Sequence, residues 1–148
     1  WGVETGAGTG ISVLRFRSPT SAWALGFNST YSKRELANDN ELTIQNHEVR
    51  LGLRGYANPE ARTRPIRGIS AIVGYEDVSV TSAGWSFGGA LELGAVHFFS
   101  RHVSLGGTID LQATYASGET TDLLTGGTED VSVIQARAGF RMLAAVYF

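Results

Sequence analysis

Apolar and polar residues alternate strictly along several long stretches of this chain. In residues 85–99, "WSFGGALELGAVHFF", every second position from Trp85 carries most of the large apolar side chains, and the positions between are mostly small or polar. Residues 103–117 and 131–148 repeat the pattern, with Val, Leu, Ile, Ala and Phe on one face. A period of two indicates β-strands that have one apolar face.

Polar, glycine- or proline-containing segments separate these alternating stretches and predict the turns. Beyond residues 1–17, the predicted strands cover residues 23–31, 43–56, 66–78, 85–99, 103–117 and 131–148. Residues 1–17 fit either one long strand or a hairpin bent at "GAGTG", and the hairpin gives eight strands with both termini at one end. We expect one domain over residues 1–148, an all-β, eight-stranded antiparallel up-and-down barrel.

Alternation alone does not say whether the apolar face points inward, as in a soluble barrel, or outward into lipid. The other face carries mainly Gly, Ser, Thr and Ala, with about one charged residue per strand. That is too little charge for a solvated surface, but it fits a narrow interior in which ions pair. The predicted interior ion network consists of Glu48, Arg50, Arg54, Glu76, Glu92, Asp110, Arg137 and Arg141.

Aromatic residues cluster at the predicted strand ends rather than in mid-strand. Such belts are typical of lipid–water interfaces, and the ten residues from Phe87 to His97 cover about 25 Å at a tilt of about 40°. We therefore predict a transmembrane barrel with its apolar face in lipid. The predicted interface aromatics are Trp23, Tyr31, Tyr75, Trp85, Phe87, Phe99, Tyr115, Tyr147 and Phe148.

The last predicted strand, "FRMLAAVYF", alternates apolar residues up to a final Phe148, and short turns such as "SPTS" and "SRH" alternate with longer polar loops. In these features the chain resembles small bacterial outer-membrane barrels of the OmpA and OmpX type. The resemblance implies a Gram-negative outer membrane, contact with its lipid and lipopolysaccharide, periplasmic termini and an assembly machinery that reads Phe148. The chain begins at Trp1 with no leader segment, so we expect that any secretory signal has been removed or never existed.

A filled, ion-paired interior favours a structural or interaction protein over a channel, since eight strands enclose little more space than side chains fill. The polar loops at 32–42 and 117–130 are the expected contact surfaces for protein partners. The alternatives are a narrow or gated pore for small solutes or ions, and a soluble barrel that binds an apolar ligand as lipocalins do.

Other chemistry finds little support in the sequence. The lipid A-modifying barrels resemble this one in size and need His with Ser at one membrane interface. We expect His47, His97 and His102 to be interfacial or loop histidines, so no enzyme is predicted. Without cysteine, thiol chemistry and zinc–thiolate sites are excluded. "GAGTG" lacks the lysine and helix of a phosphate cradle, so we expect no cofactor. A formal charge of −2 argues against nucleic-acid binding. The acidic loop residues lack the spacing of a calcium loop and are expected to be solvated, with no metal: Asp39, Glu41, Asp122, Glu129 and Asp130.

Overall fold

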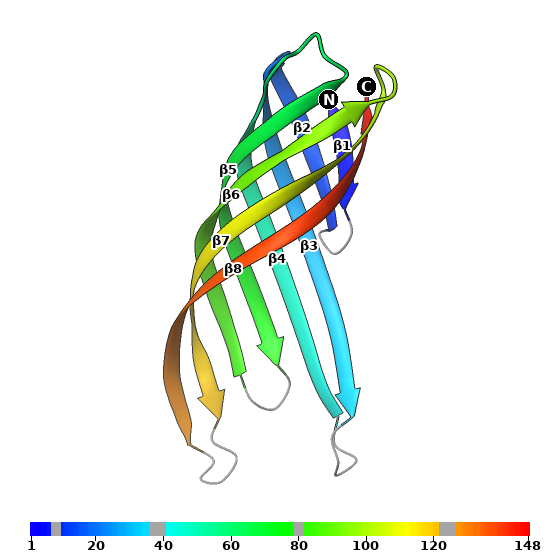
Figure 1. The fold of residues 1–148 in the computed structure, drawn as a ribbon. Helices are drawn as coiled ribbons and strands as arrows, with labels where there is room; N and C mark the ends of the chain where they lie inside the picture. The colour runs from blue at the N-terminus through cyan, green and yellow to red at the C-terminus, as the bar shows by residue number, and fades with distance from the viewer. Residues whose placement is uncertain (7–9, 36–40, 79–81, 122–126) are drawn as a thin grey trace.

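In the computed structural model, eight antiparallel strands follow one another in up-and-down order, and β1 pairs with β8 to close the ring (Figure 1). The structure describes residues 1–6, 10–35, 41–78, 82–121 and 127–148. The predicted N-terminal hairpin is confirmed, because β1 pairs antiparallel with β2. The strands are β1 Gly2–Gly6, β2 Gly10–Ser18, β3 Ser21–Glu35, β4 Glu41–Tyr56, β5 Thr63–Val78, β6 Ser82–Phe98, β7 Val103–Thr121 and β8 Thr128–Tyr147. Among these residues no helix is long and apolar enough to span a membrane.

Both termini lie at one end of the ring, together with the β2–β3, β4–β5 and β6–β7 connections (Figure 1). We call this end the turn end and the opposite end the loop end. The amide of Phe148 donates to the carbonyl of Trp1 at 2.9 Å, so the two termini meet as predicted. Residues 36–40 and 122–126, with Asp39 and Asp122, lie outside the described residues, as do residues 7–9 of "GAGTG".

The apolar face of the strands points outward. Ile109 on β7 lies between its cross-strand partners Leu93 on β6 and Phe140 on β8, and these side chains are 58%, 62% and 68% exposed. Asp110, the next residue after Ile109, is only 8% exposed and points into the ring. A soluble ligand-binding barrel has the opposite arrangement, with its apolar face lining the interior.

The strands differ greatly in length, and this leaves one side of the ring open toward the loop end. β1 has 5 residues and β2 has 9, whereas β8 has 20. β8 therefore pairs with β1 only over residues 143–147, and β3 pairs with β2 only over residues 21–27. Nearer the loop end, residues 28–35 of β3 and 128–142 of β8 each have a strand partner on one side only in the described part of the chain. We call these two edges, together with the cavity that residues 26–28 and 137–141 line between them, the side opening.

Candidate functional site

The interior of the ring at the turn end is filled by apolar side chains, which we call the apolar plug. Outside residues 1–17, for which the sequence assigned no faces, its members belong to the strand face of polar and small residues. All are at most 8% exposed, apart from the partly buried Phe16 and Phe98. The apolar plug consists of Leu14, Phe16, Ala22, Tyr56, Ile66, Val96, Phe98, Leu143, Ala145 and Tyr147.

Aromatic rings hold the apolar plug together across the ring. The Phe16 ring lies 5.5 Å from that of Tyr56 and 5.6 Å from that of Tyr147, measured between ring centroids. Phe98 stacks on Tyr147 at 5.4 Å, and the guanidinium of Arg64 lies 4.5 Å from the Phe98 ring centroid. Aromatic contacts of this kind add to the burial of apolar area, so the turn end is closed by a small hydrophobic core.

A continuous chain of ion pairs lies next to the plug, toward the loop end, and we call it the ion ladder. Its acids and arginines alternate in sign and come from β1, β4, β6, β7 and β8, so that each pair links two different strands, with Glu48 and Arg50 of β4 as the one exception. In order, the ion ladder runs Glu4, Arg54, Glu92, Arg141, Asp110, Arg50 and Glu48.

Arg54 is the most buried cation of the ladder and makes four hydrogen bonds to carboxylates. Its Nη1 and Nη2 donate to Glu4 at 2.6 and 3.1 Å, and its Nε and Nη2 donate to Glu92, both at 3.0 Å. The Arg54 side chain is 5% exposed. Bidentate pairing to two carboxylates satisfies nearly every donor of this guanidinium, which is what an ion removed from water requires.

The arginines of the remaining ion pairs are less buried than Arg54, and two of these pairs are longer than those of Arg54. Arg141 donates from Nε to Asp110 at 3.1 Å and from Nη2 to Glu92 at 3.4 Å. Arg50 lies 3.8 Å from Asp110 and donates to Glu48 at 3.1 Å. The amide of Gln112 lies beside this last pair and hydrogen-bonds both Arg50 and Glu48.

The structure brings six of the eight predicted network residues together and adds Glu4, which the sequence analysis did not include. Glu4 lies in the glycine-rich N-terminal segment, where alternation is weak. Its pairing with Ala145 of β8 gives it the inward direction of that buried alanine. Only the register between the first and last strands identifies it.

Two predicted network residues, Glu76 and Arg137, stand apart from the ladder, and this corrects the prediction. Both are exposed. Glu76 accepts a hydrogen bond from Asn46 at 3.1 Å, and Arg137 donates to Gln135 at 2.7 Å. Neither has an ion-pair partner among the described residues. Both lie nearer the loop end than the ladder, and they line the polar cavity there.

Between the ion ladder and the loop end, the interior contains two cavities instead of packed side chains. One, of about 180 Å³, is lined by polar residues including Asn46, Glu76 and Gln135. The other, of about 300 Å³, lies at the side opening and is lined from β2, β3, β4, β7 and β8. Arg137 lines both cavities. We call the second one the opening cavity.

Eight of the nine predicted interface aromatics lie on the outer surface, and Tyr147 does not. Tyr147 is 8% exposed, and its hydroxyl shares a hydrogen bond of 2.9 Å with Ser104 inside the ring. Its position in the alternation, between outward Val146 and Phe148, gives this inward direction. Three further aromatics outside the predicted set are exposed: Phe27, Phe140 and Trp1, whose ring lies 5.3 Å from the Arg15 guanidinium.

The three histidines each contact one neighbour through Nδ1. His47 lies 2.9 Å from the hydroxyl of Ser29, its cross-strand partner, and His97 lies 2.8 Å from that of Thr63. His102 bonds the carbonyl of Tyr147 at 3.0 Å. The Ser29–His47 pair is invisible in the sequence because β3–β4 pairing creates it. No carboxylate is hydrogen-bonded to any of these histidines in the described part of the chain.

Within the residues that the structure describes, no three His, Asp or Glu side chains group in a way that could hold a metal ion. No protein-family model matches the chain, and no curated protein is significantly similar to it. Function must therefore be argued from the geometry given above.

Proposed function

We propose that this chain is a transmembrane β-barrel of the Gram-negative outer membrane, with a closed turn end, that acts as a structural or interaction protein. The observation that carries the proposal is the outward apolar band. Large apolar side chains exposed by half or more occur on β2 to β8, among them Leu91 and Phe140. Monomeric soluble proteins rarely expose contiguous apolar patches beyond a few hundred Å².

The height of the band matches a bilayer. On β5, the outward residues between Arg67 and Asp77 are uncharged, and these two charges are ten residues apart. At about 3.3 Å per residue and a tilt of about 40°, that spacing corresponds to roughly 25 Å, the height of the apolar band of outer-membrane barrels. Trp85, cross-strand from Tyr75 with ring centroids 5.1 Å apart, supports an interface at the loop-end border.

The interior supports a non-conducting barrel rather than a pore. Conduction would require the Arg54 ion pairs to break and the apolar plug to move, because both lie across the axis at the turn end. A planar-bilayer recording of the purified protein is expected to show no reproducible unitary current. Such a current would favour the pore.

Replacing Leu91 with arginine tests membrane insertion directly. Leu91 is 55% exposed in the middle of the band, and arginine at a bilayer midplane costs about 2–4 kcal/mol of unfolding free energy. Ser117→Arg is the matched control, since Ser117 also points outward but lies beyond Tyr115, where a cost of about 0–1 kcal/mol is expected. Urea unfolding in phosphatidylcholine bilayers measures both. Equal costs would contradict insertion of the band, and fractionation of cells would test the outer-membrane location.

A further inference from the structure

We infer that the side opening is a lateral binding site for a single-chain amphiphile with an anionic head, which enters from the membrane between β3 and β8. The inference rests on the proposed insertion of the apolar band in a bilayer. It assigns a ligand class to the side opening, for which the proposed structural or interaction role gives no use.

The first support is the geometry of the opening. Among the residues that the structure describes, 28–35 of β3 and 128–142 of β8 have strand partners on one side only, so their outer edges carry N–H and C=O groups without a strand partner there. Unpaired backbone groups cost several kcal/mol each in hydrocarbon, so pure alkane is an unfavourable neighbour. A ligand whose polar head, with its water, meets these edges is a favourable one.

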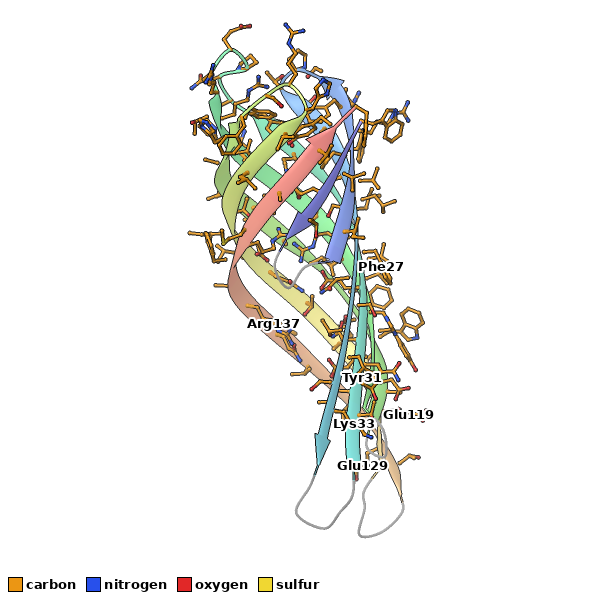
Figure 2. All side chains as sticks on the ribbon, turned by 90° about the vertical axis from the view of Figure 1, so that its right-hand side faces the viewer. Phe27, Tyr31, Lys33, Glu119, Glu129 and Arg137 are labelled. Carbon is orange, nitrogen blue, oxygen red and sulfur yellow. The ribbon has the colours of Figure 1, made fainter. Side chains whose placement is uncertain are left out.

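The second support is the rim. Phe27 on β3 and Phe140 on β8 are 54% and 68% exposed, point outward and also line the opening cavity. Ala138 lies on the same rim. Figure 2 shows Phe27 and Arg137 on the two sides of the opening. An acyl chain lying in the bilayer would contact these apolar side chains, while its head reaches inward.

The third support is charge. The charged side chains that line the opening cavity are Glu48, Arg50, Asp110, Arg137 and Arg141. Arg50 and Arg141 hold the two acids in the ion ladder, which leaves Arg137 with only the neutral Gln135 as hydrogen-bond partner in the described chain. Among the charged side chains that line this cavity, Arg137 is therefore the one cation without an ion-pair partner in the described chain. A carboxylate is the complementary head group, because a guanidinium binds it through two parallel hydrogen bonds.

The size of the cavity limits the ligand. A volume of about 300 Å³ is at the lower end of ligand pockets, so it holds a small head and the first part of one chain, not the head of a multi-chain lipid. Asn28 and Gln112 also line it and offer amide donors to the same head group. Dodecanoate combines these properties and serves as the probe.

The test uses the protein in phosphatidylcholine nanodiscs with a diazirine-bearing dodecanoate, photolysed and mapped by mass spectrometry. Labelling is expected to concentrate on residues 26–28 and 137–141. In Arg137→Gln the yield should fall about tenfold, as loss of a charge-assisted hydrogen bond predicts. Arg101→Gln is the matched control, because Arg101 is an exposed arginine in the β6–β7 turn at the other end, and its yield should equal that of the wild type.

Several outcomes would overturn the inference. Labelling spread evenly around the band, an equal yield in Arg137→Gln, or equal labelling by the uncharged dodecanol analogue would each exclude an anion-selective site. Protection of both strand edges from hydrogen exchange before any amphiphile is added would point to a paired strand from another chain instead. If these results come from a protein that inserts normally, the proposed function stands. If the protein does not insert, both proposals fail.

Discussion

The two halves of this ring are built from the same strands and differ in what fills them. At the turn end, eight strands surround the apolar plug and the buried ion pairs of Arg54, and Leu14 is completely inaccessible to solvent. Toward the loop end, β1 and β2 have ended, two cavities replace the packing, and inward residues such as Val133 are 45% exposed. We therefore expect stability to be concentrated in the closed half, which contains the packed side chains and the buried ion pairs.

The strongest test of this contrast removes the centre of the ion ladder. Arg54→Leu leaves Glu4 buried without a partner, and an uncompensated buried charge costs about 3–5 kcal/mol. Urea unfolding in lipid bilayers measures the loss. Arg101→Leu, in the exposed turn, should change the unfolding free energy by no more than about 0.5 kcal/mol. If the two variants unfold at the same urea concentration, the ladder does not stabilise the turn end.

Arg141 and Arg137 allow a sharper comparison, because they lie four residues apart on the same face of β8. Arg141→Leu breaks hydrogen bonds to Asp110 and Glu92 and is expected to cost about 2–3 kcal/mol. Arg137→Leu removes only a contact with Gln135 and should stay within about 0.5 kcal/mol. The same unfolding assay measures both losses. A larger loss in Arg137→Leu than in Arg141→Leu would show that the boundary between the two halves does not lie between these residues.

The fold could be predicted further than the site. Alternation placed Leu91 and Ile109 on one face and Glu92 and Asp110 on the other, and turn composition separated the strands. Alternation could not show that Arg141 joins the ion ladder and that Arg137 does not. Alternation fixes which way a side chain points but not how far β1 reaches along β8, and that register decides whether an inward arginine meets an acid.

The apolar plug was missed for a related reason. Phe98 and Tyr147 are inward by alternation, yet they lie near strand ends where aromatic residues suggest an interface belt. Within one strand, an inward and an outward aromatic at the turn end can be adjacent residues, as Tyr147 and Phe148 are. Only the convergence of Phe98 and Tyr147 with Phe16 across the ring shows that they form a core.

Packing in the two halves can be compared with one kind of substitution. Val96 on β6 is 2% exposed inside the plug, and Val133 on β8 is an inward residue near the loop end that is 45% exposed. Val96→Ala is expected to lower the unfolding free energy by about 2 kcal/mol, and Val133→Ala by at most about 0.5 kcal/mol. Similar losses at both positions would mean that the loop-end half packs as tightly as the turn end.

Hydrogen exchange should reveal the smallest difference, at the two strand edges. Amides of β3 between residues 28 and 35 that point away from β4 have no strand partner within the described ranges, whereas those between residues 21 and 27 pair with β2. The first group is expected to exchange faster by on the order of tenfold or more, since unpaired amides need no opening step. Mass spectrometry of the protein in nanodiscs measures this, and uniform protection along β3 would argue against an open side.

The seam between β1 and β8 also governs how the molecule is made. The amide of Phe148 binds the carbonyl of Trp1, so the contact that completes the cylinder joins residues 147 positions apart. Contacts between such distant residues carry a large loop-closure entropy and slow folding. Until β1 pairs with β8, the polypeptide is an open sheet with two unpaired edge strands. Formation of the five residue pairs between β1 and β8 is the step that closes it.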